Sequence, residues 1–270
     1  MTTEPARRYL DAVRPMTTPN LPPLRASALP TFMDCPRRGL VNLLPGETAD
    51  YYGIPRRHPA LNIATVIGTA LHKFAETGDA DKSEFIMREA EENHPLAPDA
   101  ATPTLNDGIV QLRWMMDCFQ RKFPNWRKNA ILEVAVETEI NGKKITGTPD
   151  RIAGGMVFDI KTTARQAGPS FAPQMGAYCQ ATKSDKGAMI VIVPRKPMKT
   201  KTTEIKIYPL DYGDCAAAAG QAADIAETQW NNLWSRGVNA THANPSSALC
   251  SRNFCRAHGT DFCPITKETQ

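Results

Sequence analysis

The spacing of apolar residues changes from a helical period to a strand-like one near residue 131. Before that point, apolar side chains recur every three or four residues, as on one face of an amphipathic helix. The helices expected there span 61–77, 81–93 and 105–122. After it come short alternating or continuously apolar stretches that are rich in β-branched side chains. These stretches predict strands at 131–140, 143–152, 156–163, 187–194 and 202–210, with further helices at 169–183 and 211–236.

Turn signals predict how the first strands connect. Asn141-Gly142 is a strong hairpin dipeptide, and Gly154-Gly155 marks a second tight turn. The strands joined by these turns should form a meander, followed by a helix and two more strands. The sequence therefore predicts an α/β (α+β) fold with a central mixed sheet flanked by helices. The prolines clustered before residue 24 indicate a flexible leader over 1–24, followed by a single domain over 25–270.

Composition narrows the class of protein. The chain has 270 residues, of which 41% are hydrophobic and 22% are charged, as is ordinary for a globular domain. No apolar run approaches the roughly 18 residues of a membrane span, and no apolar segment follows the N-terminal arginines as it would in a secretory signal. We therefore expect a cytoplasmic protein with no membrane contact. The net charge of +4 neither demands nor excludes a polyanionic partner.

Two aspartates and a lysine lie on adjacent predicted strands. Asp150 precedes the Gly154-Gly155 turn, while Asp159 and Lys161 are two residues apart on the next strand and so share one face. Asp159 also interrupts an apolar run, where an unpaired carboxylate is costly to bury. Two hard oxygen ligands beside an ammonium group suit Mg²⁺ or Mn²⁺ and the activation of a water molecule. A surface ion pair on an edge strand is the alternative interpretation.

Further polar residues flank this pair in a fixed order. The motifs are G-x-x-x-H ending at His72, G-x-P-D ending at Asp150, D-x-K ending at Lys161, and Q-x-x-x-Y from Gln174 to Tyr178. Each motif alone is degenerate, and a single helical histidine is more often structural. Together they resemble the RecB-like nuclease branch of the PD-(D/E)xK superfamily, which has a restriction-endonuclease-like core. The resemblance covers residues 27–264, with the first motif in a helical region over 61–123 and the catalytic sheet over 131–210.

The resemblance implies a role for each motif residue. The divalent cation would be bound by three side chains and one backbone carbonyl, those of His72, Asp150, Asp159 and Ile160. Lys161 would position the attacking water. Gln174 and Tyr178 would organise the site and contact the nucleic acid. Many relatives have Glu at the position of Asp159, whose side chain is one methylene shorter, and Glu137 or Glu139 is a weak candidate for an additional acid.

Seven cysteines in a chain expected to be cytoplasmic point to metal binding or packing and not to disulfides. Cys250, Cys255 and Cys263 form a cysteine-rich coda over 245–265. The resemblance extends to the iron–sulfur subgroup of these nucleases, in which Cys35 would complete the four thiolate ligands of a [4Fe–4S] cluster. The alternative is a Zn²⁺ site made by the three coda cysteines and His258. The other cysteines have apolar neighbours on predicted helices and are expected to fill the core: Cys118, Cys179 and Cys215.

The iron–sulfur subgroup includes CRISPR-adaptation exonucleases, AddB-type nuclease domains and phage exonucleases. The resemblance thus implies a Mg²⁺- or Mn²⁺-dependent deoxyribonuclease that acts in DNA recombination, repair or CRISPR-related processing. It favours an exonuclease over an endonuclease. A phage-encoded protein would act in the host cytoplasm. The expected partner is DNA with linear ends, single-stranded or carrying single-stranded regions, together with a recombination or CRISPR-adaptation protein. A non-catalytic nucleic-acid-binding zinc or iron–sulfur protein and a site-specific endonuclease are the alternatives, and the oligomeric state is left open.

Short basic runs are candidates for phosphate contacts in such an enzyme, although most runs of this kind are solvated faces. They lie at Arg37-Arg38, Arg56-Arg57, Arg121-Lys122 and 195–201. The last of these, between two predicted strands, is the strongest candidate for a nucleic-acid groove.

Overall fold

The computed structural model describes residues 18–56, 62–98, 102–163, 168–193, 203–252 and 255–265. The chain divides into two compact units, each assembled from separated stretches of sequence. The first comprises the described parts of Met1–Pro59, Glu139–Ile145 and Ala218–Gln270, and the second those of Ala60–Thr138 and Thr146–Ala217. The single domain expected over 25–270 stays a prediction. Among the described residues, no helix is both long and apolar enough to cross a bilayer.

In the second unit, the described residues form a five-stranded mixed sheet in the order β2-β5-β6-β7-β8. These strands are β2 (Ile131–Leu132), β5 (Arg151–Ala153), β6 (Met156–Thr162), β7 (Lys186–Val193) and β8 (Glu204–Asp211). β6 and β7 run parallel, whereas the other neighbouring strands are antiparallel. The predicted α/β class with a mixed sheet is therefore confirmed.

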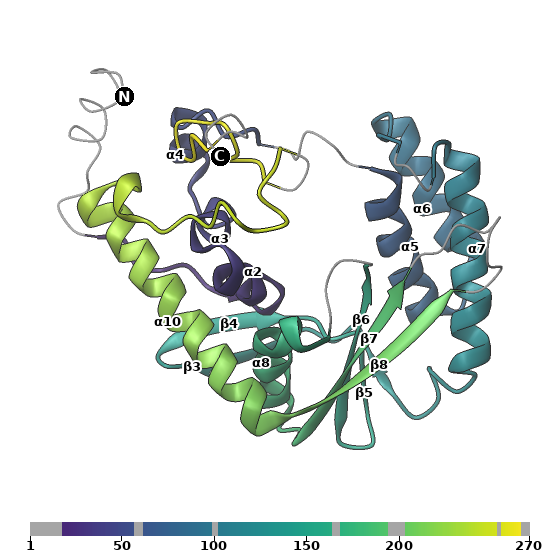
Figure 1. The fold of residues 1–270 in the computed structure, drawn as a ribbon. Coiled ribbons are helices and arrows are strands. Elements are labelled where there is room, and N and C mark those ends of the chain that lie inside the picture. Colours follow the sequence, from purple (N-terminus) through teal and green to yellow (C-terminus); the bar gives the residue numbers. More distant parts are fainter. Residues whose placement is uncertain are drawn as a thin grey trace. The chain divides into compact units, whose positions relative to one another are not determined.

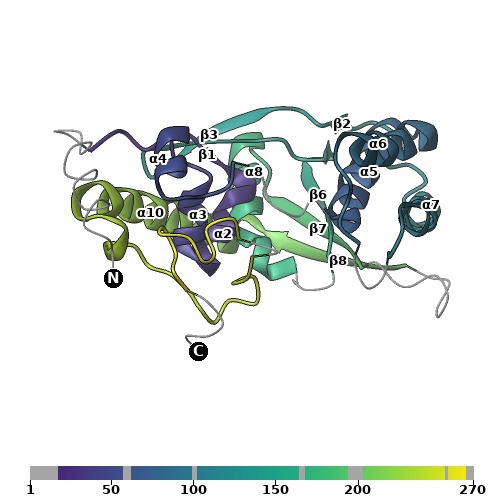
Figure 2. The same ribbon diagram turned by 90° about the horizontal axis from the view of Figure 1, so that it is seen from above.

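Helices α5 (Ile63–Thr77), α6 (Ala80–Asn93) and α7 (Leu105–Lys122) lie side by side in the second unit (Figure 1; Figure 2). Their apolar stripes form one core with Ile160 of β6 and Ile190 of β7. These helices therefore cover the sheet face on which the even-numbered residues of β6 point. All three predicted helices are confirmed to within two residues at each end.

Polar caps fix where two of these helices begin. The side chain of Asn62 accepts a hydrogen bond from the Thr65 N–H at 2.8 Å, which satisfies a donor in the first turn of α5. Thr104 and Asp107 form a reciprocal capping box at the start of α7. These signals are local in sequence, which is why the helix bounds are readable from it.

The opposite sheet face is covered by α8 (Ala172–Thr182), which follows the short 3₁₀ helix η2 (Gly168–Phe171). The α-helix therefore begins three residues later than predicted. Gly176 of α8 faces the first turn of α10 (Tyr212–Arg236), and a Cβ there would collide with the carbonyl oxygen of Cys215. A glycine at this position lets the two helices approach closely.

Gly176→Ala is expected to lower the free energy of unfolding by roughly 1–3 kcal/mol, because backbone has to move to admit the methyl group. Gly213→Ala, in the first turn of α10, is the matched control, since nothing lies within 4 Å of a Cβ added there, and a change below about 1 kcal/mol is expected. Urea unfolding measures both. Equal stabilities of the two variants would contradict this packing.

Two predicted strands are wrong as single strands. The stretch 131–140 is divided into β2 and β3 (Val136–Ile140), and 143–152 into β4 (Lys143–Gly147) and β5. Among the described residues, β3 and β4 belong to a separate three-stranded sheet of order β1-β4-β3. Glu133 has a left-handed backbone (φ 47°) in the first break, and Pro149, which lacks an N–H donor, lies in the second.

The first unit contains the N-terminal helices, the C-terminal segment and the tip of the β3–β4 hairpin. Its elements include β1 (Leu24–Arg25), η1 (Ala26–Ala28), α2 (Leu29–Asp34), α3 (Pro36–Val41), α4 (Gly46–Tyr51), most of α10 and η3 (Val238–Ala240). Lys143 at the hairpin pairs with Asp224 and Glu227 of α10, each at 2.9 Å. The hairpin is thereby attached to the helix.

The end of the expected flexible leader is part of this unit. Leu24 is fully buried in β1, and the carbonyl oxygen of Pro19 accepts a hydrogen bond from the indole Nε1 of Trp230 at 2.7 Å. The leader predicted over 1–24 therefore does not extend to residue 24, because Leu24 buries its side chain and Pro19 binds α10. Residues 1–17 lie outside the described part of the chain.

Candidate active site and cysteine pocket

Asp150 lies just before β5 and is held from two sides. Its Oδ1 atom lies 2.6 Å from Nδ1 of His72 on α5. Its Oδ2 atom accepts a hydrogen bond from the backbone N–H of Ile160 at 2.5 Å. Burial raises the pKa of Asp150, but the charge and hydrogen bond of His72 outweigh this and leave the pKa below its usual value. The two carboxylate oxygens thus face different neighbours.

Asp159 lies on β6 with its carboxylate almost fully buried. Its Oδ2 atom is 2.6 Å from Nζ of Lys161, and its Oδ1 atom accepts a hydrogen bond from Nε2 of Gln174 at 3.0 Å. Burial raises the pKa of Asp159 to about 6, in spite of the adjacent ammonium group. The pKa of Lys161 is raised, because the attraction of Asp159 exceeds the effect of burial.

Gln174 and Tyr178 are one turn apart on α8 and complete the arrangement. Nε2 of Gln174 donates to the Tyr178 hydroxyl at 3.2 Å, and this hydroxyl donates to the carbonyl oxygen of Thr148 at 3.2 Å. Burial raises the pKa of Tyr178, which keeps the phenol protonated. Oε1 of Gln174 is buried and has no hydrogen-bond partner among the described residues. The helix thereby fixes both Asp159 and the turn that carries Asp150.

His72 reaches Asp150 because α5 packs closely on β6. A Cβ at Gly68 would lie only 2.6 Å from Oγ1 of Thr162, so a glycine is the residue that fits this contact. Gly68 and His72 are four residues apart and lie on the same face of the helix. In the first motif, Gly68 is thus required for the packing of α5 on β6, and His72 makes the polar contact with Asp150.

Glu133 is a site residue that the sequence analysis missed. Its N–H donates to the carbonyl oxygen of Asp150 at 3.4 Å. One ligand atom from each of His72, Glu133 and Asp150 lies within 4.8 Å of the others, and Asp159 is outside this group. Burial and contact with Asp150 raise the pKa of Glu133 to about 8. Glu137 and Glu139, the weak candidates for an additional acid, are exposed on β3.

The alternation of the sequence could not identify Glu133. Glu133, Glu137 and Glu139 fall on the same phase of the alternating pattern, so a continuous strand would place all three on one face. The left-handed backbone at Glu133 ends β2 and breaks that phase. The visible signal is only an acidic residue two positions after the start of a predicted strand.

The chemistry of these side chains fits a divalent cation. Among the residues that the structure describes, three carboxyl groups, of Glu133, Asp150 and Asp159, lie around two cationic groups, the ammonium of Lys161 and the imidazole of His72 when protonated. Carboxylate oxygens and an imidazole nitrogen are hard or intermediate ligands of the kind that Mg²⁺ and Mn²⁺ accept. A bound cation would relieve the repulsion among the carboxylates.

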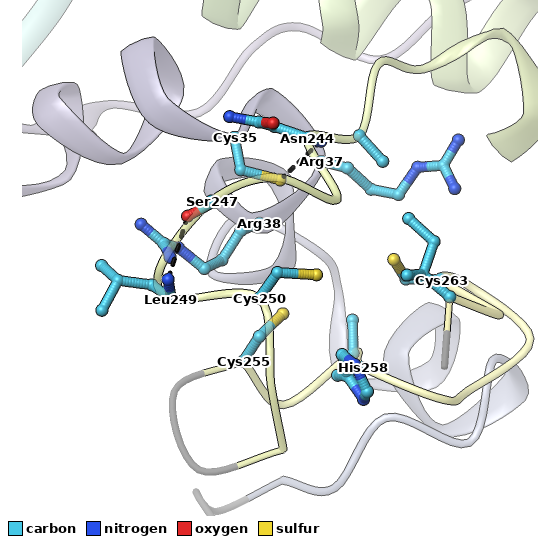
Figure 3. A pocket seen from close by; sticks show the side chains of 13 residues that line it. Cys35, Arg37, Arg38, Asn244, Ser247, Leu249, Cys250, Cys255, His258 and Cys263 are labelled. Atoms are coloured by element: carbon cyan, nitrogen blue, oxygen red, sulfur yellow. Dashed lines mark hydrogen bonds between the residues drawn. The ribbon is translucent and has the colours of Figure 1, made fainter. Parts of the chain in front are cut away.

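The first unit contains a pocket that brings four distant cysteines together. Cys35, between α2 and α3, lines it with Cys250, Cys255 and Cys263 of the coda, and their sulfur atoms face a common space (Figure 3). All four thiols are free. Burial and neighbouring thiols raise the pKa of Cys250, and burial raises that of Cys255. Four soft donors around one space fit either an iron–sulfur cluster or Zn²⁺.

Polar groups beside the cysteines complete the pocket. The backbone N–H of Asn244 donates to Sγ of Cys35 at 3.4 Å. His258 also lines the pocket, with Nδ1 buried and without a hydrogen-bond partner among the described residues. Arg38 pairs with Asp34 at 2.8 Å through Nη2. His258 therefore remains available as the fourth ligand of the alternative zinc site.

Two arginines hold the C-terminal segment after α10 against the N-terminal helices. Arg37 of α3 donates to Oγ1 of Thr241 at 3.0 Å and to the carbonyl oxygens of Val238 and Thr241. Arg256 donates to the Arg56 carbonyl oxygen at 2.8 Å. The prediction of phosphate contacts by Arg37-Arg38 is wrong, because Arg37 is buried and Arg38 nearly so. Both arginines instead bind groups within the first unit.

The other basic runs and cysteines are placed as follows. Arg121 is exposed and pairs with Asp117 at 2.9 Å, whereas Arg57 and the run 195–201 lie outside the described residues.

Cys179 and Cys215 are buried, as expected of core residues. Cys118 is only half-buried, and its sulfur meets Nη2 of Arg121 at 3.6 Å. The expectation that Cys118 fills the core therefore fits this half-buried residue poorly.

Comparison with known protein families matches residues 23–265 of the chain to the PD-(D/E)XK nuclease superfamily. The chain belongs to this superfamily. The resemblance inferred from the four motifs is therefore confirmed, and the mixed sheet flanked by helices is the PD-(D/E)XK nuclease core. Membership of this superfamily makes the protein a nuclease.

Solved structures include further similar folds, whereas no curated protein matches the chain. A "putative exonuclease" from Eubacterium rectale is 12% identical, with a TM-score of 0.56 over 93% of this chain and 92% of that one. At this identity it shows the shared fold of the PD-(D/E)XK nuclease. An alkaline exonuclease from Laribacter hongkongensis is 13% identical over 68% of this chain and 95% of that one, with a TM-score of 0.31. A TM-score of that size does not establish a shared fold.

Proposed function

We propose that this nuclease is a Mg²⁺- or Mn²⁺-dependent DNA exonuclease. The observation that carries the proposal is the set of contacts that joins the four motifs: His72 to Asp150, Asp150 to the β6 backbone, and Asp159 to both Lys161 and Gln174. A non-catalytic relative would be expected to lack one of the two acids or the lysine, and this chain has all three. The exonuclease description of the structural neighbour from Eubacterium rectale is in line with this choice.

The cation would be held by His72, Asp150, Asp159 and the carbonyl oxygen of Ile160. When bound, Mg²⁺ or Mn²⁺ supplies Lewis-acid chemistry to a phosphodiester and makes a water molecule more acidic. Asp159 is kept in position by Gln174, so its carboxylate stays in place when the substrate enters. The buried Oε1 atom of Gln174 is an acceptor that a nucleotide or a water molecule can use.

Lys161 would orient the attacking water through Nζ. Its ammonium lies beside Asp159, and its raised pKa keeps it protonated, so it acts as a donor and as a positive charge near the phosphate. Tyr178 would contact the nucleic-acid strand while its hydroxyl holds the Thr148 carbonyl. Hydrolysis then releases nucleotides from a DNA end, with the leaving oxygen stabilised by the positive charge of the site.

The expected result for DNA cleavage is digestion of end-labelled linear DNA and no cleavage of closed circular DNA, in the presence of Mn²⁺. Linear and circular substrates, each single- and double-stranded, are incubated with the intact protein and analysed on gels. Cleavage of the circles would support the endonuclease alternative. Inactivity on every substrate, by protein with its cysteine site loaded, would support the non-catalytic alternative.

We also propose that Cys35, Cys250, Cys255 and Cys263 bind a [4Fe–4S] cluster with a structural role. The convergence of Cys35 on the three coda cysteines supports this set over the zinc set, which does not need Cys35. Metal binding to these thiolates would contribute directly to the folding of the first unit. Action in DNA recombination, repair or CRISPR-related processing in the cytoplasm, with a protein partner from such a process, belongs to the same proposal.

A further inference from the structure

The face of α8 that reaches the candidate active site carries a third side chain, which belongs to none of the four motifs. Phe171 ends η2 immediately before α8, at i with Gln174 at i+3 and Tyr178 at i+7. Residues at this spacing line one face of a helix. Gln174 binds Asp159, and Tyr178 binds the Thr148 carbonyl oxygen. Phe171 therefore extends the same row of side chains toward the start of the helix.

The ring of Phe171 lies against the ammonium group of Lys161. Nζ of Lys161 is over the face of this ring, 5.9 Å from its centroid. An ammonium within roughly 6 Å of the centroid is attracted by the negative face of an aromatic ring. The ring is buried, so packing fixes its position. The Lys161 side chain is only 24% exposed, and the attraction is stronger where water is excluded.

The ring and Asp159 act on Lys161 in different ways. Oδ2 of Asp159 lies 2.6 Å from Nζ and takes one of its N–H donors. The ring attracts the charge but supplies no oxygen or nitrogen lone pair, so donors that do not bind Asp159 stay available for a water molecule. Lysine has a long flexible stem. A second attractive group beside Nζ therefore restricts where the ammonium lies without using it up.

We infer that Phe171 is a positioning residue of this nuclease, whose ring face holds the ammonium of Lys161 where Nζ orients the attacking water. Phe171 acts through Lys161 and not on the substrate. The row of side chains on α8 then fixes two groups of β6, Lys161 through Phe171 and Asp159 through Gln174. The inference rests on the proposed function, since it adds a residue to the same site.

The test replaces Phe171 in the full-length protein, with its cysteine site loaded, and measures cleavage of end-labelled linear DNA with Mn²⁺. Phenylalanine analogues with one, two or three ring fluorines keep the side-chain shape closely and weaken the negative face of the ring. The expected result is a stepwise fall of kcat, by about tenfold for three fluorines, with an unchanged KM for DNA.

The same analogues at Phe119 are the matched control. Phe119 is a fully buried ring on α7 that packs on Phe123 and Trp126. Its fluorinated forms should keep kcat within about twofold of the natural value, because this ring lies in the hydrophobic core between the helices and the sheet. The control separates the loss of ring charge at Lys161 from the general effect of fluorine in a buried ring.

A double-mutant cycle shows whether Phe171 acts through Lys161. Phe171→Leu alone removes the ring and should lower kcat by about tenfold. In the Lys161→Ala background, the same substitution should change the remaining rate by less than about twofold, because the ammonium on which the ring acts is gone. A ring that only supported the packing of α8 would lower the rate equally in both backgrounds.

Either of two results would overturn the inference. They are a kcat that is constant across the fluorinated series at Phe171, or an equal loss in both backgrounds of the cycle. The fluorinated series decides the matter even if Phe171→Leu does not fold. A natural protein that digests DNA at a rate independent of the fluorines would refute the role of Phe171 and leave the proposed function standing. A natural protein that digests no DNA would refute both.

Discussion

Lys161→Ala is expected to lower the rate of Mn²⁺-dependent DNA cleavage by about 10²–10³-fold, the size of effect seen when one preorganised donor is removed from an active site. The ammonium of Lys161 lies 2.6 Å from Oδ2 of Asp159 and would no longer orient the water molecule. The fold should survive, because the pKa of Asp159 is already raised to about 6 and the carboxyl can take a proton in place of the lost charge. Initial rates on linear DNA and circular dichroism measure the two properties.

Two further variants sharpen this result. Asp150→Asn keeps the shape of the side chain and should lose cleavage together with Mn²⁺ affinity, since it removes a charged ligand. Lys186→Ala removes the same charge as Lys161→Ala from an exposed position at the start of the neighbouring strand β7, and its rate should stay within about twofold of the natural one, as for a surface substitution. Full activity in both Lys161→Ala and Asp150→Asn would refute the assignment of the site.

Cys255→Ser is expected to abolish metal binding in the first unit and to lower the melting temperature by roughly 10 °C. A structural metal contributes its binding energy to folding, and a loss of about 3–4 kcal/mol corresponds to such a shift in a domain of this size. Cys255 is buried and faces the other pocket thiols (Figure 3). Calorimetry with iron, acid-labile sulfide and zinc analysis on anaerobically purified protein measures both effects. Cys118→Ser, at a half-buried thiol on α7, is the control and should change neither.

One pair of variants separates the two candidate metals. The [4Fe–4S] proposal requires Cys35 and not His258, whereas the zinc alternative requires His258 and not Cys35. Iron retained in His258→Ala and lost in Cys35→Ser would support the cluster. A colourless protein with one Zn²⁺ that is retained in Cys35→Ser would replace the cluster by the zinc site.

The helices and the order of the motifs were readable from the sequence because their signals are local. Thr104 and Asp107 cap α7 within one turn, and the apolar stripe of α5 repeats at the helical period. The divided strands were not readable. Whether residues 131–140 pair in one sheet or two depends on partners far away in sequence. In the sequence, only Pro149 hints at a break, and that break is the second one.

The site shows the same division between local and distant information. The pair Asp159 and Lys161 follows from strand alternation, and Gln174 and Tyr178 follow from helical spacing. Glu133 could not be separated from Glu137 by pattern, since its side chain reaches the site only through an unusual backbone angle. The burial of Arg37 could not be predicted from the sequence pattern either, because the carbonyl groups that it binds belong to residues about 200 positions later.

The order of synthesis has a consequence for the cysteine pocket. Arg37 and the carbonyl oxygen of Phe262 meet in the folded protein but are 225 residues apart in the chain. At ribosomal rates, the two ends of this pocket emerge on the order of 10 s or more apart. Cys35 must therefore wait, as an open thiol, until almost the whole nuclease sequence has been made. A metal site made by these four thiols would therefore form only after Cys263 has been made, and a chain that stops before the coda would lack three of the four thiols.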